Sequence, residues 1–303
     1  MSSLKHVYYF QAGIGVLANA FLLLFFTFTI YRDHRPKPTD MATWHLAFVH
    51  IVMLFTVQDS LSANMFMSLN FPNDFKCKAL LYMSRVMRGL SICTTCLLSI
   101  IQVITISPST FFLTRFKHKL TNYVSHALFC FWSLNLSSNS IMIIYTVGHS
   151  NMTNLLSVSK YCSLSSVNSI IMELFFVLTL SQNVFFVGIM LLSSAYMVNL
   201  LSSHQKRSGY IHSINISPRI SPAKRATHTV LLLVTFFVII YCLDIIISSF
   251  STMLWKYDPV VLDVQRLVGN VYATVSPLVL ISSDKRIIGI LQNVIDMISI
   301  SKH

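Results

Sequence analysis

Ionisable side chains inside long apolar stretches are the residues of this sequence most able to do chemistry. Such groups are costly in a bilayer and usually serve a function. Their side chains carry both signs of charge: Asp59, Arg85, Arg88, Glu173, Asp244, Asp263 and Arg266. Arg85 and Arg88 are three residues apart, so a helix would put them on one face. The set predicts a polar pocket that binds a small ligand, which we call the cup. The alternative is that these residues form structural ion pairs and that some of the side chains reach toward the helix ends.

The composition indicates that a bilayer is the solvent around these residues. The chain has 303 residues, of which 54% are hydrophobic and 11% charged, and its mean hydropathy is +0.66. Soluble domains carry about 25% charged residues, so this surface is too poor in charge for water. The net charge of +12 does not indicate a nucleic-acid partner, because the basic residues alternate with apolar runs and form no continuous face.

Seven apolar stretches are long enough to position the charged groups in a membrane. A spanning helix needs about 20 mostly apolar residues. The stretches that fit are roughly 9–31, 42–66, 79–104, 123–147, 170–199, 228–250 and 260–281. The expected fold class is therefore all-α, a seven-helix transmembrane bundle forming a single domain over residues 1–303. The loops are short and no repeat relates the two halves, which argues mildly against a transporter.

A further helix is expected after the seventh stretch. Its apolar residues recur at helical spacing on one face: Ile287, Ile288, Leu291, Val294, Ile295 and Ile298. This pattern predicts a short amphipathic helix on the inner leaflet, and the alternative is an apolar tail without fixed structure.

The distribution of Lys and Arg predicts the orientation. The loops 32–41, 107–122 and 200–227, together with the tail after 281, carry 14 of the 22 basic residues. The opposite side carries 5, and 3 lie inside the stretches. Because excess Lys and Arg mark the cytoplasmic side, the N-terminus is expected outside and the C-terminus inside.

Two cysteines and one glycosylation sequon fall on the expected outer side. Cys77 and Cys162 would be exposed to oxidising conditions, where a disulfide persists, and the alternative is two free thiols. Asn151, in Asn-Met-Thr, is the accessible sequon. Asn135 lies within a span and Asn215 on the cytoplasmic side, so neither is expected to be glycosylated.

The sequence lacks the motifs of an enzyme. It contains no His-Glu-x-x-His, no Gly-x-Ser-x-Gly, no phosphate loop and no dinucleotide fingerprint, so neither catalysis nor a cofactor is expected. His45 and His50 are five residues apart and do not share a helix face, which favours hydrogen-bonded packing over metal binding. Cys93 and Cys96 are interpreted as small packing residues rather than a redox or metal pair.

Several stretches, in order along nearly the whole chain, resemble the vomeronasal type-1 (pheromone) receptors. They are FQAGIGVLAN (10–19), DHRPKPTD (33–40), HLAFVHIVML (45–54), LSIIQVITISPS (98–109), NVFFVGIML (183–191), SPRISPAKRATHTVLLLV (217–234) and TVSPLVL (274–280). The resemblance implies a G-protein-coupled receptor of the plasma membrane, which detects a small chemosignal outside and activates an inhibitory-class G protein inside. The cup residues Asp59, Arg85, Arg88, Glu173, Asp244 and Arg266 are then the candidates for ligand binding.

The signatures shared by most rhodopsin-like receptors are altered. Asp-Arg-Tyr at the inner end of the third helix is replaced by Ile101-Gln102-Val103, so an Arg–acid lock is not possible there. Asn-Pro-x-x-Tyr of the seventh helix begins here as Ser276-Pro277, and Pro277 is the expected kink. Gln182 and Asn183 stand where the family usually has Arg-Asp.

Activation is expected to separate the inner ends of the third, fifth and sixth helices and to admit the G protein. The candidates for G-protein contact are Gln102, Lys206, Arg207, Lys224 and Arg225.

Two other classes of membrane protein compete with this interpretation. A bitter-taste receptor is also short-tailed and seven-helical, but that family generally lacks the outer cysteine pair. A small transporter or channel would need charges along the whole path, whereas these are confined to the expected outer half.

Overall fold

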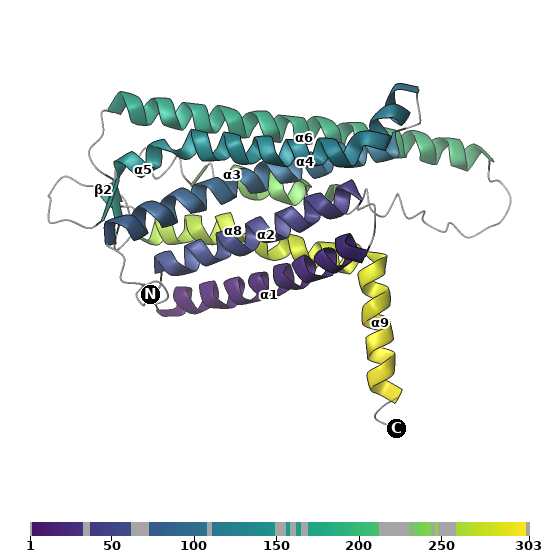
Figure 1. Ribbon diagram of the computed structural model, residues 1–303, viewed down its shortest axis with the longest axis horizontal. Helices are drawn as coiled ribbons and strands as arrows, with labels where there is room; N and C mark the ends of the chain where they lie inside the picture. Colours follow the sequence, from purple (N-terminus) through teal and green to yellow (C-terminus); the bar gives the residue numbers. More distant parts are fainter. Residues whose placement is uncertain are drawn as a thin grey trace.

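Long helices packed side by side make up the computed structural model of the chain (Figure 1). It describes residues 2–32, 37–61, 73–107, 111–148, 156–157, 162–164, 169–211, 231–232, 234–243, 246–247 and 259–300. The helices are α1 (Ser2–Arg32), α2 (Pro38–Leu61), α3 (Asn73–Ile106), α4 (Phe111–Asn139), α5 (Ile141–Tyr145), α6 (Ser169–Ile211), α8 (Pro259–Ser283) and α9 (Lys285–Ile300). Residues 234–243 are also helical. The prediction of an all-α bundle is confirmed.

The length of apolar helix differs from one element to another. In the described part of the chain, three helical segments are long and apolar enough to cross a membrane: Tyr9–Arg32, Lys78–Ile106 and Val177–Leu200. Val234–Leu243 and Leu267–Ser283 are shorter apolar segments. The helices α1, α3, α6 and α8 extend past both ends of the predicted stretches. Hydropathy marks the part of a helix suited to hydrocarbon and not the residue where the helix ends.

The helix α4 ends at Asn139, before the end of the helix predicted over 123–147. Its last turn is rich in Ser and Asn, whose side chains compete for backbone carbonyls. The Asn139 amide donates to the carbonyl of Asn135 at 2.9 Å, and the Ser140 hydroxyl donates to that of Ser137 at 2.7 Å. The chain turns at Ser140 and continues as α5 and the strand β1.

Three very short strands lie at the end of the bundle where the N-terminus begins (Figure 1). They are β1 (Thr146–Gly148), β2 (Leu156–Ser157) and β3 (Cys162–Leu164), in the order β1-β3-β2 with antiparallel pairing. The strand β1 packs against α3, and Gly148 of β1 pairs with Cys162 of β3. The backbone of the predicted disulfide residue Cys162 therefore lies at the end of the bundle where α3, with Cys77 in its first turns, begins.

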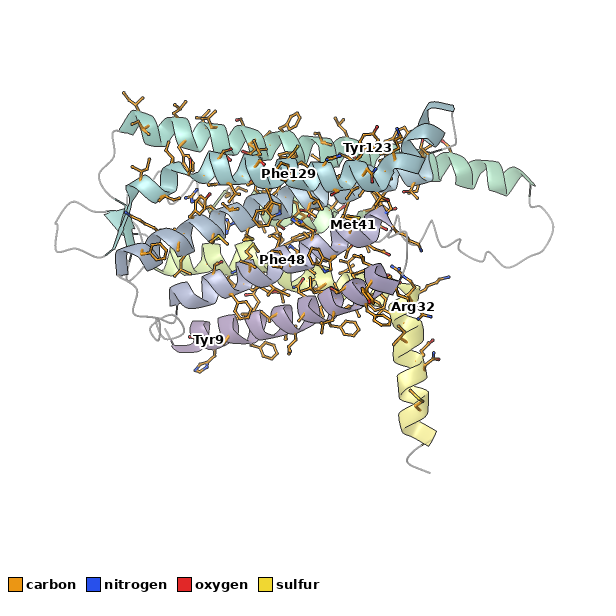
Figure 2. All side chains as sticks on the ribbon, viewed as in Figure 1. Tyr9, Arg32, Met41, Phe48, Tyr123 and Phe129 are labelled. Atoms are coloured by element: carbon orange, nitrogen blue, oxygen red, sulfur yellow. The ribbon has the colours of Figure 1, made fainter. Side chains whose placement is uncertain are left out.

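At the opposite end, α9 leaves the bundle and runs across its long axis (Figure 1). Asp284 is the single residue between α8 and α9. Side chains cover the bundle along its length, and Tyr9 and Arg32 mark the two ends of the apolar part of α1 (Figure 2). Many large apolar side chains on α1 are exposed, among them Phe10, Leu17 and Leu24, as expected of a surface that faces lipid.

Close contact between α1 and α8 depends on a glycine. A Cβ at Gly15 would lie 2.7 Å from Leu54 Cδ1 and 3.0 Å from Thr274 Oγ1. Leu54 belongs to α2 and Thr274 to α8, so Gly15 lets α1 approach both helices closely, as small residues do in membrane bundles.

Candidate functional site

The two arginines of the predicted cup contact different helices. The Arg85 guanidinium of α3 lies over the ring of Phe175 on α6, with its carbon 5.7 Å from the ring centroid. The Arg88 guanidinium instead packs on α8, where a Cβ at Gly269 would overlap Arg88 Nη2 and lie 3.1 Å from Arg88 Cζ. The absence of a side chain at Gly269 therefore makes room for Arg88. Residues predicted to share one helix face are divided between α6 and α8.

The remaining cup residues are described only in part. Asp59, Glu173 and Arg266 lie in α2, α6 and α8, but their side chains are outside the described residues, as is all of Asp244. The side chains of Cys77 and Cys162 and the sequon residue Asn151 also lie outside the described residues. Their roles in ligand binding, disulfide formation and glycosylation therefore stay predictions.

Farther along the helices lies a set of buried polar contacts that we call the middle layer. It links α2, α3, α4 and α8 and consists of His45, His50, Ser91, Thr94, Thr95, Trp132, Tyr272 and Ser276.

His50 connects three helices through the middle layer. Its Nε2 atom lies 2.9 Å from Ser91 Oγ on α3, and its Nδ1 atom lies 3.2 Å from Ser276 Oγ on α8. The Tyr272 hydroxyl lies 3.1 Å from Thr95 Oγ1. Because the Thr95 hydroxyl donates to the backbone of Ser91, Tyr272 is the donor to Thr95. The Tyr272 ring also contacts the Phe237 ring, with 4.6 Å between centroids.

His45 forms a second chain of hydrogen bonds in the middle layer. The Trp132 indole N–H donates to His45 Nε2 at 2.9 Å, and His45 Nδ1 lies 3.0 Å from Thr94 Oγ1. An indole only donates, so the His45 proton is on Nδ1, which donates to Thr94. Thr94 in turn donates to the backbone of Leu90 at 2.7 Å. The predicted hydrogen-bonded packing of both histidines is confirmed.

A proline determines the position of one further polar contact. Pro277 lies inside α8 and has no N–H, so it cannot bond the carbonyl four residues earlier, at Ala273. Asn19 of α1 donates to that carbonyl at 2.8 Å and to the carbonyl of Gly15 at 2.8 Å. A side chain from a neighbouring helix thus satisfies the acceptor that the proline frees.

Asn135 holds α4 against α3 and α6. Its amide donates to the Phe131 carbonyl at 2.8 Å and to Cys93 Sγ at 3.6 Å, while Gln182 Nε2 of α6 lies 3.5 Å from Asn135 Oδ1. A Cβ at Gly89 would overlap the same oxygen. Asn135 is buried, in agreement with the expectation that this sequon is not glycosylated. Gln182, one of the two departures from the family pattern, has a packing role here.

Near the α9 end, the predicted G-protein contacts are described unevenly. Gln102 is buried on α3. Lys206 and Arg207 lie in the last turns of α6 with side chains outside the described residues, and Lys224 and Arg225 lie wholly outside them. Their role in G-protein contact therefore stays a prediction.

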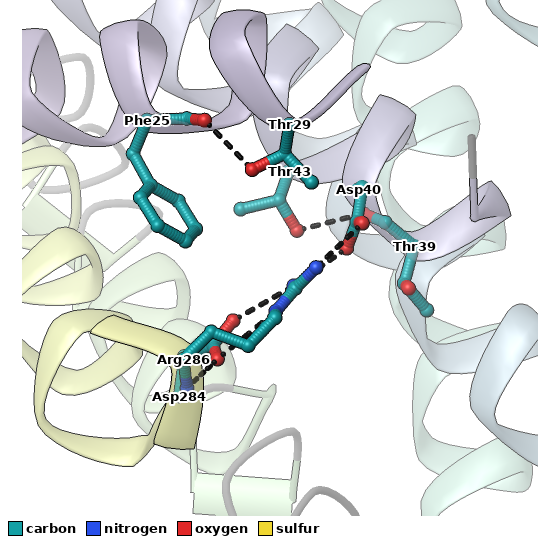
Figure 3. Close-up of polar contacts among 7 residues, drawn as sticks. All are labelled: Phe25, Thr29, Thr39, Asp40, Thr43, Asp284 and Arg286. Atoms are coloured by element: carbon teal, nitrogen blue, oxygen red, sulfur yellow. Dashed lines mark hydrogen bonds and ion pairs between the residues drawn. The ribbon is translucent and has the colours of Figure 1, made fainter. Parts of the chain in front are cut away.

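An ion-paired contact joins α2 to α9, and we call it the inner clamp (Asp40, Asp284 and Arg286; Figure 3). The two terminal nitrogens of Arg286 donate to the two Asp40 oxygens, each at 2.9 Å. Arg286 also donates to Asp284 through its backbone N–H at 2.9 Å, through Nη2 at 2.9 Å and through Nε at 3.3 Å. The hydrogen bond to Asp40 is the main cause that raises the pKa of Arg286 above its ordinary value.

The inner clamp is a contact that the sequence did not predict. Both Asp40 and Arg286 fall on the predicted cytoplasmic side, and Asp40 follows Pro38 in the first turn of α2. That position favours an acid near a helix N-terminus, but it does not say which of many basic residues pairs with it.

Comparisons with known proteins cover almost the entire chain. A family model described as the vomeronasal organ pheromone receptor family matches residues 2–293. Vomeronasal type-1 receptor 90 of Rattus norvegicus is 39% identical over 283 residues, which are 93% of this chain and 91% of the relative. Vomeronasal type-1 receptor 48 of Mus musculus is 37% identical over 293 residues, 96% of each chain. Vomeronasal type-1 receptor 94 of Rattus norvegicus is 36% identical and covers 96% of this chain and 90% of the relative.

Proposed function

Because the chain belongs to the vomeronasal organ pheromone receptor family, we propose that it binds a small pheromone-like molecule in an outward-facing cup and activates an inhibitory-class G protein. Members of this family are pheromone-sensing G-protein-coupled receptors, so the chain is a multi-pass receptor of the plasma membrane and not an enzyme. The match over residues 2–293 carries this conclusion and does not favour the bitter-taste alternative.

The proposed orientation puts the N-terminus outside and α9 in the cytoplasm. Its support is the excess of basic residues in the loops assigned to the side of the C-terminus. Lys285 and Arg286 are the first residues of α9, and Lys37 directly precedes α2, whose first turn carries the Asp40 that binds Arg286. In this orientation, Arg85 and Arg88 belong to the outer half of α3.

The proposed ligand site is centred on Arg85 and Arg88. The guanidinium groups are directed toward α6 and α8, so a ligand that contacts both would lie among α3, α6 and α8. Asp59, Glu173, Asp244 and Arg266 complete the proposed cup. A ligand can shift the helix bundle only to the extent that it binds the active arrangement more tightly than the resting one.

The middle layer connects the proposed cup to the cytoplasmic side. Ser91 and Thr95 are one and two turns beyond Arg88 on α3, and both belong to hydrogen-bonded contacts that reach α8. A displacement of α3 against α8 at the arginines must therefore rearrange these contacts. Opening of the cytoplasmic ends would then expose Gln102, Lys206, Arg207, Lys224 and Arg225 to the G protein.

A response screen tests the proposed function. Cells expressing the chain, with an epitope tag for surface quantification, are imaged for calcium against fractionated urine and synthetic volatiles. Responses are expected to vanish when a toxin ADP-ribosylates the inhibitory-class α subunit. An ion flux that persists in cells lacking G proteins would instead indicate a channel or transporter.

Variants of the arginine site sharpen this test. Arg88→Ala is expected to lower potency on the order of tenfold or more, since it removes a charge from the proposed ligand contact. Gly269→Ala keeps the charge but displaces the guanidinium, and it should lower potency as well. Gly188→Ala, where an added Cβ meets nothing within 4 Å, is the control. Full responses of Arg85→Ala and Arg88→Ala at normal surface expression would make these arginines structural.

A further inference from the structure

We propose that Arg286 is a positioning residue for signalling, which holds α9 and the end of α8 against α2 through Asp40. This inference rests on the proposed function, in which the α9 end of the bundle faces the G protein. Arg286 then acts by giving the cytoplasmic surface its shape before the G protein binds.

The buried negative charge of Asp40 explains why a cation is needed at Arg286. The Asp40 side chain is 5% exposed, while that of Arg286 is 37% exposed. A buried carboxylate without a partner is strongly destabilising, whereas a partly exposed guanidinium can still be solvated. The forked geometry, with one nitrogen to each carboxylate oxygen, restricts orientation more than a single contact would. Loss of Arg286 therefore affects the clamp more than loss of Asp40.

The short connection between α8 and α9 makes this contact a constraint on both helices. Asp284 alone separates them, and its carboxylate accepts from the backbone N–H of Arg286, as an N-cap does. The Asp284 N–H donates to the carbonyl of Leu280 and its own carbonyl accepts from Ile288, each at 3.0 Å. Hydrogen bonds thus run from the last turn of α8 into α9 without a flexible linker.

Apolar contacts fix the same junction against α1. Ile287 is buried in a cluster with Leu22, Phe26 and Ala47. The Arg286 guanidinium carbon lies 5.7 Å from the centroid of the Phe26 ring, and 5.8 Å from that of the neighbouring Phe25. Such cation–π contacts add to the ion pair. The junction is therefore held by α1 and α2 together.

Preorganisation is the consequence for signalling. If α9 can adopt many orientations, a partner that binds the cytoplasmic face must supply the entropy cost of ordering it. The inner clamp removes that cost in advance. The clamp lies close to the inner end of α3, because Ala42 packs in a buried cluster with Ile101. The residue after Ile101 is Gln102, so no arginine is present at that position to form an Arg–acid pair.

The experiment uses the full chain purified into lipid nanodiscs. Spin labels are attached at Tyr31→Cys and Met297→Cys, two exposed positions on α1 and α9, after Cys130 and Cys242 are replaced by Ser. The width of the label-to-label distance distribution reports the orientation of α9. Ligand-independent nucleotide exchange on a purified inhibitory-class heterotrimer reports coupling.

Four variants separate positioning from simple loss of charge. Arg286→Gln is expected to broaden the distance distribution and to slow exchange on the order of fivefold. Lys285→Gln, which removes the neighbouring exposed charge, should leave both unchanged. Arg286→Lys keeps the positive charge but loses the two-nitrogen contact with the carboxylate. Its distance distribution and exchange rate should lie between those of Arg286→Gln and Lys285→Gln. Asp40→Asn combined with Arg286→Gln should perturb the chain less than Arg286→Gln alone, because no buried carboxylate is left unpaired.

An unchanged distance distribution in Arg286→Gln would overturn the proposal, as would equal slowing in Lys285→Gln. If Arg286→Gln does not fold, the comparison of the native chain with Arg286→Lys and with the double variant decides the question. Absence of any G-protein-dependent response in the calcium screen would count against the proposed function, while the distance distribution would still test the clamp.

Discussion

In the middle layer, the described partners of the polar side chains are neutral hydrogen-bonding groups, whereas the inner clamp pairs a buried carboxylate with an arginine. His45 and His50 have a hydroxyl or an indole at each ring nitrogen. Asp40 instead has the Arg286 guanidinium, which is 37% exposed at the α9 end of the bundle.

The difference between these regions follows from the solvent around them. In the hydrocarbon part of a bilayer, a charge costs far more than a neutral polar group, and neutral donors and acceptors can satisfy each other completely. At the helix ends, one member of an ion pair can keep part of its hydration, so a charged contact becomes possible. The middle layer therefore joins helices through hydrogen bonds between neutral side chains, and the inner clamp joins them through one strong, salt-sensitive ion pair.

The largest expected effect on stability tests whether the side chains packed around Gly89 can move to accept an added Cβ. Gly89→Ala places a Cβ where it overlaps Asn135 Oδ1, and Asn135 is buried and bonded to α3, α4 and α6. The variant should lose about 2 kcal/mol of stability through overpacking. Thermal unfolding of the purified chain measures the loss.

Gly188→Ala is the matched control, because a Cβ there meets nothing within 4 Å. It should be neutral or stabilise by up to about 1 kcal/mol, since alanine favours helix over glycine. Equal unfolding temperatures for the two variants would mean that Asn135 can move aside.

The sequence predicts the described helices and the hydrogen-bonded packing of His45 and His50. Helical periodicity and apolar length follow from local residues, and α9 lies where apolar spacing placed it. The spacing of His45 and His50 indicated different helix faces, and the two rings do meet different partners. These features depend on residues close together in the chain.

Contacts between distant segments could not be predicted in the same way. The partner of Asp40 is 246 positions away, and the Ala273 carbonyl that accepts from Asn19 is 254 positions away. Both require knowledge of which helix ends are neighbours. Arg85 and Arg88 illustrate the limit: their spacing is local, but their separation toward α6 and α8 depends on Phe175 and Gly269.

A smaller expected effect tests the link between the two regions, which runs along α8. Asn19→Ala leaves the Ala273 carbonyl without its donor, because Pro277 has no N–H to offer. The cost should be about 1 kcal/mol, as for other polar contacts between membrane helices. Pro277→Ala restores a backbone donor for that carbonyl, so Asn19→Ala should cost less in that background. A double-mutant cycle of unfolding temperatures measures the coupling, and additive effects would contradict this origin of the Asn19 contact.

The smallest expected effect sharpens the contrast between neutral and charged contacts. Trp132→Phe removes one hydrogen bond to His45 and should cost about 0.6 kcal/mol, the average for such contacts in membrane bundles. Trp44→Phe removes a similar bond to the exposed Thr27 and should cost less. The shift for Trp132→Phe should not change with salt, whereas that for Arg286→Gln should shrink as salt rises, because Arg286 is partly exposed. Equal salt dependence of the two shifts would remove the distinction between the middle layer and the inner clamp.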